Sequence, residues 1–287
     1  MPPDRRSPDE LPSPPGETAL GTRLPSLLLD DVARVLAELS GLSLRDGLDP
    51  RLADGLDDAA RAAGEPPRAF ARRVLAREPR AVETLVEHVV VSETAFWRHP
   101  EQLAAVGRVA AAATGPLSIW SAGCATGEEP YSVAIALLEA GRAGRGDRIL
   151  ATDVSSRALD AARAGVYGVR SVRRLPPDLA ARWLEGEGER RVREDVRGLV
   201  TFARHNLVAR DPAPGGPFDL VLCRNVLIYF DPYAAVEVVR RLAGALAPGG
   251  RLVLGPVELP LGAAAGLVPV RQDGATLLER ILVPAER

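Results

Sequence analysis

Lysine is absent from the 287-residue chain, so its 36 basic residues are all arginines, and 38 acidic residues nearly balance them to a net charge of −2. That balance excludes a strong positive field, of the kind that attracts nucleic acid or an anionic membrane to a protein. Cys124 and Cys223 are too few for a secreted disulfide scaffold and lack metal-ligand spacing, which favours the reducing cytoplasm. No apolar run reaches about 18 residues, so the sequence predicts no membrane insertion.

The length and composition predict a folded protein of about two domains. Hydrophobic residues make up 46% of the chain and charged residues 26%, which is typical of folded proteins. Residues 1–25 contain seven prolines and no apolar core of the kind that a signal peptide needs. We expect this segment to be a disordered, proline-rich leader.

A helical pattern follows the leader. Apolar residues recur three and four apart from Leu28 to Leu39, and Gly41 ends this predicted helix. Further helices are predicted at about residues 50–63, 66–77 and 80–91. Together they predict a small helical domain with its linker over residues 26–100, although they are alternatively the outer helices of one larger domain.

From about Gln102 the pattern alternates between strand and helix. Alternation of this kind predicts a mostly parallel sheet covered on both faces, over residues 101–287. It fails at residues 165–198, where we expect an insertion. The strands are predicted at 117–120, 148–152, 200–203, 218–223 and 251–254, and the main helices at 131–139, 155–164 and 233–247.

A turn of small residues, Gly123 to Gly127, follows the first predicted strand and lets a ligand approach the backbone. It lacks the Gly-Lys-Ser/Thr ending of a phosphate loop, and Glu128 and Glu129 would repel a pyrophosphate. Asp153 ends the second strand, where doubly wound folds place an acid on ribose hydroxyls, although it alternatively caps the next helix. A nucleoside with positive charge and no phosphate is S-adenosylmethionine.

Four blocks of sequence, at residues 92–98, 123–131, 151–153 and 223–231, carry a resemblance to a known family. In these blocks and their spacing the chain resembles the CheR-type chemoreceptor glutamate O-methyltransferases, over nearly everything after the leader. The resemblance implies an α/β protein: a Rossmann-like class I methyltransferase domain with a mostly parallel seven-stranded sheet. A small antiparallel β insertion at about 165–198 and a small all-α N-terminal domain are implied as well.

The resemblance also implies the site residues. Arg98 and Tyr229 are the expected catalytic residues, Tyr229 pointing toward the transferring methyl group. Phe96, Trp97 and Phe230 are expected to serve packing rather than catalysis, and Arg98 is alternatively a surface ion pair. The expected cofactor-binding residues are Ser92, Thr94, Arg98, Gly123, Glu129, Asp153 (ribose), Asn206 (near the adenine), Cys223, Arg224 and Asn225.

The implied reaction moves a methyl group from S-adenosylmethionine to glutamate carboxylates on cytoplasmic helices of a bacterial chemoreceptor. The products are the methyl ester and S-adenosylhomocysteine. A glutamate is ionised at pH 7, so the attack needs no general base. We expect a cytoplasmic monomer without a metal. The alternatives are a same-fold methyltransferase acting on another protein or a small molecule, and a non-catalytic cofactor-binding signalling module.

Three departures from the family pattern bear on these expectations. Ser92 replaces a usual Asn, and residues 255–258 read Gly-Pro-Val-Glu in place of Gly-His-Ser-Glu, which we expect to weaken contacts there. Residues 26–100 carry ten Arg against thirteen acids, whereas the family's helical domain is typically basic. A local stripe of Arg68, Arg72, Arg73 and Arg77, spaced by fours, is the expected docking surface for an acidic receptor helix, or else a solvated face.

Overall fold

The computed structural model describes residues 24–44, 50–209, 211 and 213–280. Of the leader expected at residues 1–25, residues 1–23 lie outside the described part of the chain.

The first helices of the described chain form a region with its own core. Gly41 ends the first of them in the left-handed conformation (φ 75°), donating its N–H to the carbonyl of Ala37. Proline stands in the first turn of the third and fourth helices. A backbone N–H at that position would have no partner within the helix, so its absence costs nothing there. Their apolar faces meet in one cluster that includes Leu36, Phe70 and Leu85. The helices are α1 (Ser26–Ser40), α2 (Pro50–Ala63), α3 (Pro67–Leu75) and α4 (Pro79–Val89); we call them the helical region.

The rest of the described chain is built on a seven-stranded sheet, ordered β6-β2-β1-β7-β8-β10-β9. All neighbouring strands are parallel except β10, which is antiparallel to β8 and to β9. This confirms the predicted mostly parallel seven-stranded sheet of a Rossmann-like methyltransferase. The strands are β1 (Ser118–Ala122), β2 (Arg148–Asp153), β6 (Val200–Arg204), β7 (Phe218–Cys223), β8 (Leu246–Leu254), β9 (Leu267–Gln272) and β10 (Ala275–Arg280).

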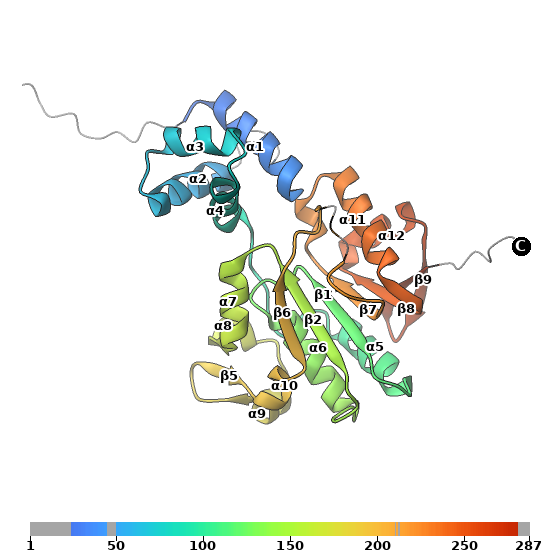
Figure 1. Ribbon diagram of the computed structural model, residues 1–287. Helices are drawn as coiled ribbons and strands as arrows, with labels where there is room; N and C mark the ends of the chain where they lie inside the picture. The colour runs from blue at the N-terminus through green and yellow to red at the C-terminus, as the bar shows by residue number, and fades with distance from the viewer. Residues whose placement is uncertain (1–23, 45–49, 210, 212, 281–287) are drawn as a thin grey trace, which may run out of the picture.

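Helices cover both faces of this sheet (Figure 1). Because successive strand residues point to opposite faces, Ile119 packs into one core and Trp120 into another. The first core includes residues of α5 (Pro100–Ala112) and α6 (Glu128–Glu139), and the second includes residues of α11 (Pro232–Gly244). Helices α7 (Ser156–Ala164) and α12 (Leu259–Ala264) complete the two layers.

The insertion forms a three-stranded antiparallel sheet, ordered β3-β5-β4. It lies within the 165–198 stretch where the antiparallel insertion was expected, but short helices, which we did not predict, occupy much of it. Its elements are β3 (Val166–Tyr167), α8 (Val169–Val172), α9 (Pro177–Trp183), β4 (Leu184–Glu185), β5 (Arg190–Val192) and α10 (Glu194–Arg197).

Three predicted boundaries are wrong. The helix expected at 233–247 ends at Gly244, and β8 begins at Leu246 rather than Arg251. Phe218 pairs with Leu246 and Leu220 with Arg251, so the Pro-Gly-Gly stretch bulges inside the strand instead of preceding it. The third helix ends at Leu75 rather than Arg77, because Arg77 adopts a left-handed φ of 58° between α3 and α4.

The helical region stands over one edge of the large sheet, joined to α5 by residues 90–99 (Figure 1). The parallel strands β1, β2, β6 and β7 all end at this edge. Within the described ranges, no helix has both the length and the apolar character that crossing a bilayer requires.

Candidate active site

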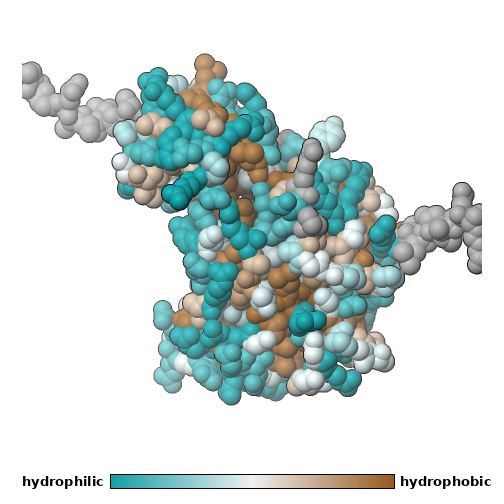
Figure 2. Space-filling view, in the orientation of Figure 1, coloured by the Kyte–Doolittle hydropathy of each residue, from teal (hydrophilic) through white to brown (hydrophobic). Residues whose placement is uncertain are grey.

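A cleft of about 910 Å³, counted out to its open mouth, lies where the helical region meets the carboxyl ends of the strands. Figure 2 shows apolar side chains around the hollow at this junction. Among the predicted site residues, the walls include Ser92, Thr94, Arg98, Gly123, Glu129, Asp153, Asn206, Arg224, Asn225 and Tyr229.

The two glycines of the turn after β1 have no room for side chains. Gly123 has a φ of 79°, and a Cβ there would lie 2.7 Å from a methyl carbon of Val226. Gly127, at φ 95°, would meet Ala162 at 2.8 Å and the hydroxyl of Tyr167 at 2.9 Å. The backbone N–H groups of Gly123 and Cys124 both donate to the carbonyl of Thr152, which ties the turn to the end of β2. At Gly123 the turn therefore presents bare backbone to the cleft, as the sequence predicted.

Asp153 is held rigidly at the end of β2. Its Oδ2 accepts the backbone N–H of Ala125 at 2.8 Å, and its Oδ1 accepts that of Ser155 at 2.9 Å. The N-cap of α7 is Ser155, whose hydroxyl accepts the N–H of Ala158, so Asp153 is not the residue that caps this helix. A carboxylate has about four lone-pair sites, which leaves Asp153 able to accept two hydroxyl groups. Burial raises the pKa of this carboxyl above its ordinary value.

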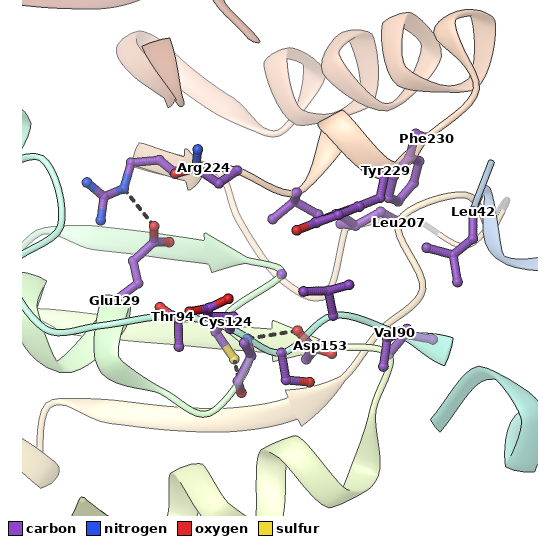
Figure 3. Close-up of a pocket in the computed structure, with 18 of the residues that line it drawn as sticks. Leu42, Val90, Thr94, Cys124, Glu129, Asp153, Leu207, Arg224, Tyr229 and Phe230 are labelled. Carbon is purple, nitrogen blue, oxygen red and sulfur yellow. Dashed lines mark hydrogen bonds and ion pairs between the residues drawn. The ribbon is translucent and has the colours of Figure 1, made fainter. Parts of the chain in front are cut away.

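Glu129 and Arg224 form a buried ion pair in the cleft wall (Figure 3). Glu129 Oε2 accepts from Arg224 Nε and its Oε1 from the hydroxyl of Ser121, each at 2.7 Å. Arg224 also donates to the carbonyl of Arg98 at 2.7 Å and to Gln102 Oε1 at 3.2 Å. The pair thus fixes the segment that carries Arg98, and the direct contacts of Glu129 and Arg224 with a cofactor stay predictions.

The loop after β7 is organised by Glu258. Its carboxylate accepts the backbone N–H groups of Gly255, Asn225, Val226 and Leu227 at 2.7–2.9 Å. The Pro and Val that depart from the family pattern leave these bonds intact: Pro256 opens the short 3-10 turn η2 (Pro256–Glu258), and the side chain of Val257 is 73% exposed. The contacts of Glu258 are therefore kept in spite of the departure.

Strained backbone is concentrated around the cleft. Six described residues other than glycine have positive φ, and four of them, Trp97, His99, Ala125 and Asn225, flank the site at 47–60°. Asn225 Oδ1 is buried without a hydrogen-bond partner in the described part of the chain. Such strain persists only where surrounding contacts enforce it, and it is common at functional sites.

Arg98 and Tyr229 line the same cleft. No described acidic side chain pairs with the Arg98 guanidinium, so the surface ion pair considered for it is not formed. Tyr229 ends the 3-10 turn η1 (Leu227–Tyr229), and its hydroxyl points into the cleft (Figure 3). The helical region touches this residue twice: Ser43 N–H donates to its carbonyl at 2.7 Å, and the Arg51 guanidinium lies 5.8 Å from its ring centroid.

Asn206 lines the cleft and also bridges the two parts of the chain. Its Nδ2 donates to the carbonyl of Leu39 at the end of α1, at 2.7 Å, and its Oδ1 accepts the N–H of Val208 at 3.1 Å. Neighbouring His205 packs edge-on against Trp120, and burial lowers its pKa below the ordinary value.

Cys223 does not lie in the cleft wall. It is fully buried in the core on the α11 side of the sheet, and burial raises the pKa of its thiol. Because side chains alternate along a strand, the last residue of β7 points away from the cofactor side. Its side chain is therefore not available to the cleft, and the predicted role of Cys223 in cofactor binding stays a prediction for its backbone alone.

Two of the four arginines in the predicted docking stripe already have acidic partners, and the docking role stays a prediction. Arg73 pairs with Glu78 and Glu65, and Arg77 pairs with Glu38. Of the four arginines, only Arg68 and Arg72 are exposed without a side-chain partner among the described residues.

Sequence reasoning missed several lining residues. Ser40 and Leu42 come from the end of α1, and no local pattern connects them to a site more than a hundred residues away. Leu42 forms a β-bridge with Phe230, whose aromatic side chain also lines the cleft. His205 and Leu207 flank the predicted Asn206, so that prediction was a sufficient signal for them.

The walls suit S-adenosylmethionine. The fixed carboxylate of Asp153 can accept ribose hydroxyls, and apolar Leu207 lies beside Asn206 for a base. The bare turn at Gly123 allows a bulky ligand to lie against the backbone.

Comparison with known proteins agrees with this cleft. Residues 92–263 match the family described as "CheR methyltransferase, SAM binding domain". Chemotaxis protein methyltransferase 2 of Pseudomonas aeruginosa is 38% identical over 193 residues, which cover 64% of this chain and 69% of that protein. The chemotaxis protein methyltransferase of Escherichia coli is 35% identical over 182 residues, 61% of this chain and 64% of that one.

Two other similarities are weaker or partial. The probable biofilm formation methyltransferase WspC of Pseudomonas aeruginosa is 39% identical over 67% of this chain, which spans 47% of that protein. Among solved structures, the mitomycin 7-O-methyltransferase MmcR is 17% identical, and the match covers 89% of this chain and 73% of that one. Its TM-score of 0.39 is too low to support an argument. On the family match and the curated relatives, the chain belongs to the CheR family of S-adenosylmethionine-dependent methyltransferases.

Proposed function

We propose that this enzyme methylates glutamate side chains on the cytoplasmic helices of a bacterial chemoreceptor, and so tunes chemosensory signalling. Relatives named chemotaxis protein methyltransferase support the pathway. The observation that carries the acceptor is the Arg98 guanidinium, which lines the cleft without an acidic partner in the described chain. An unpaired cation in the cleft that also holds Tyr229 suits an anionic acceptor.

For this reaction the protein has mainly to position the two reactants. The bound cofactor supplies an electrophilic methyl group on a sulfonium. A glutamate acceptor is ionised at pH 7, its pKa being about 4.3, so the cleft needs no general base. Arg98 orients the carboxylate by charge-assisted hydrogen bonds, and Tyr229 holds it from the other side. Because the reactants carry opposite charges, excluding water and aligning them supply the rate enhancement.

The similarity to WspC, a protein named as a probable biofilm formation methyltransferase, supports a second class of acceptor. A protein of another signalling array would then take the methyl group, by the same chemistry. Because receptor methylation helices lie in the cytoplasm, we place the enzyme there, acting as a monomer.

The test is methyl transfer from labelled S-adenosylmethionine to a purified receptor cytoplasmic fragment. A carboxyl ester releases methanol at high pH, so we expect the incorporated label to be base-labile. Arg98→Met should lower incorporation at least about tenfold, the loss of one charge-assisted hydrogen bond, and Arg98→Lys should retain part of it. Base-stable label, or full incorporation by Arg98→Met, would contradict a carboxylate acceptor.

A further inference from the structure

The turn between Asp153 and α7 is held by a side chain of the helical region. Glu87, on α4, accepts the backbone N–H of Ser156 at 2.5 Å through Oε1 and the hydroxyl of Ser155 through Oε2. Arg157 reaches back across the same junction and donates to the carbonyl of Glu87 at 3.0 Å. Figure 1 shows α4 above α7 at this point.

These bonds form one network that begins at Asp153. The first N–H groups of a helix have no partner within the helix, and side chains supply them here. Ser155 N–H donates to Asp153 Oδ1, Ser156 N–H to Glu87, and Ala158 N–H to the Ser155 hydroxyl, which itself donates to Glu87. Glu87 is the one member of this network that comes from the helical region, and its negative charge suits a helix N-terminus.

We propose that Glu87 is a positioning residue for the cofactor. By fixing the Ser155–Ser156 turn it fixes the carboxylate of Asp153, so that cofactor affinity depends on the seating of the helical region. The inference rests on the proposed contact between Asp153 and the ribose. Since α4 belongs to the region expected to dock the receptor, docking and cofactor binding become coupled through this carboxylate.

A neighbouring residue provides a matched control. Glu83 lies one turn earlier on the same face of α4 and pairs with Arg204 across the same junction at 2.9 Å. Both side chains of that pair are about half exposed, 45% for Arg204 and 51% for Glu83, so the pair contributes little. Arg204 also donates to the backbone carbonyl of Val154 at 3.1 Å, a bond that does not involve Glu83. Within the described chain, Glu83 itself has no hydrogen bond to the Asp153 carboxylate or to the N–H groups that begin α7.

The experiment measures the Kd of S-adenosylmethionine by calorimetry and kcat at saturating cofactor. Glu87→Ala should raise Kd about five- to tenfold, within the range of couplings between neighbouring residues, and should leave the saturated kcat unchanged. Glu87→Gln keeps one acceptor oxygen and should give an intermediate Kd. Glu83→Ala should stay within about twofold of the native Kd. Thermal melts establish that each variant is folded.

A double-mutant cycle with Asp153→Ala separates the possible outcomes. If Glu87 acts through Asp153, Glu87→Ala should weaken binding no further once Asp153 is replaced. Losses that multiply would overturn the inference, as would an unchanged Kd in Glu87→Ala. If Asp153→Ala alone leaves Kd unchanged, the ribose contact itself is wrong and this inference falls with it. If Asp153→Ala weakens binding and Glu87→Ala does not, only the role of Glu87 fails.

Discussion

Asp153 meets the cofactor cleft with each carboxylate oxygen already accepting one backbone N–H, so it needs no rearrangement to accept hydroxyl groups. We expect Asp153→Ala to weaken S-adenosylmethionine binding by about 1.5–3 kcal/mol, the scale of a hydrogen bond to a charged group. Calorimetry on the folded variant measures this. Asp160→Ala, an exposed acid on α7 paired with Arg163, is the control and should bind normally. Native affinity in Asp153→Ala would remove the residue from the site.

The raised pKa of Asp153 predicts a pH dependence of cofactor binding. Burial disfavours the ionised form, so this carboxyl takes up a proton at a higher pH in the folded protein than in the unfolded chain. The carboxylate is the better acceptor, so affinity should be full above the raised pKa and fall as the pH drops through it. Protonation favours the folded state, so this residue's contribution to stability rises over the same interval.

Binding measured between about pH 4 and pH 7 tests this. In Asp153→Asn the group no longer titrates, and the fall in affinity toward low pH should flatten. An equally steep fall in that variant would assign the pH dependence to another group.

Residues that stand in a local motif were predictable, and those assembled from distant segments were not. Thr94, Asp153 and Tyr229 reach the cleft because strand ends and turns place them there. Leu42 and Glu87 carry no signal of their own, since their partners are far away along the chain. The burial of the Cys223 side chain was not predicted, because it depends on side-chain alternation along β7, which turns it into the core on the α11 side.

Helix α3 shows how an element boundary alters a surface. Spacing by fours places two residues on one face only within a single helix, and Arg77 lies beyond the end of α3 at Leu75. Acids of the helical region then pair with Arg73 and Arg77. The exposed Arg68 and Arg72 remain one turn apart on α3, a smaller basic surface than the sequence suggested.

If these two arginines dock the receptor, reversing both to Glu should raise the KM for receptor without changing the Kd of S-adenosylmethionine. The effect should shrink above about 0.15 M salt, where exposed charges are screened beyond roughly 8 Å. The double reversal of Arg145 and Arg148, both exposed and distant from α3 along the chain, changes the net charge equally and should leave KM unaltered. Unchanged receptor methylation by the α3 variant at low salt would show that its arginines are only solvated.

The main strands were predictable because their apolar runs fill a core covered on both faces. The last two were not: β9 is mostly exposed and contains Pro269, as suits the edge of a sheet, so it lacks a clear apolar pattern. Its hairpin partner β10 was missed with it. Helix α5 escaped notice because it is rich in alanine and buries a face with few large side chains.

The whole molecule has separate cores, and the cleft lies between them. The helical region packs around its own cluster, while the sheet packs around clusters on its two faces. We expect calorimetric unfolding without ligand to show the helical region melting before the sheet, because smaller cores are less stable.

Residues of both parts line the cleft, so we expect S-adenosylmethionine to contact both and to move the two transitions upward and closer together. At about 100 times its Kd, a ligand specific for the folded state adds about 2.7 kcal/mol of stability. Two transitions whose separation is unaffected by saturating ligand would show that the cofactor site does not include the helical region.

Selection for heat resistance would act early on the left-handed residues around the cleft. Trp97, His99, Ala125 and Asn225 each hold a conformation that costs about 1–3 kcal/mol. Substitutions that relax these torsions, such as glycine at Ala125, would be retained in such a screen, and they would loosen the turns that shape the cleft. Thermostable variants selected from this chain should therefore have a lower kcat, because thermal stability and turnover depend on the same few backbone angles.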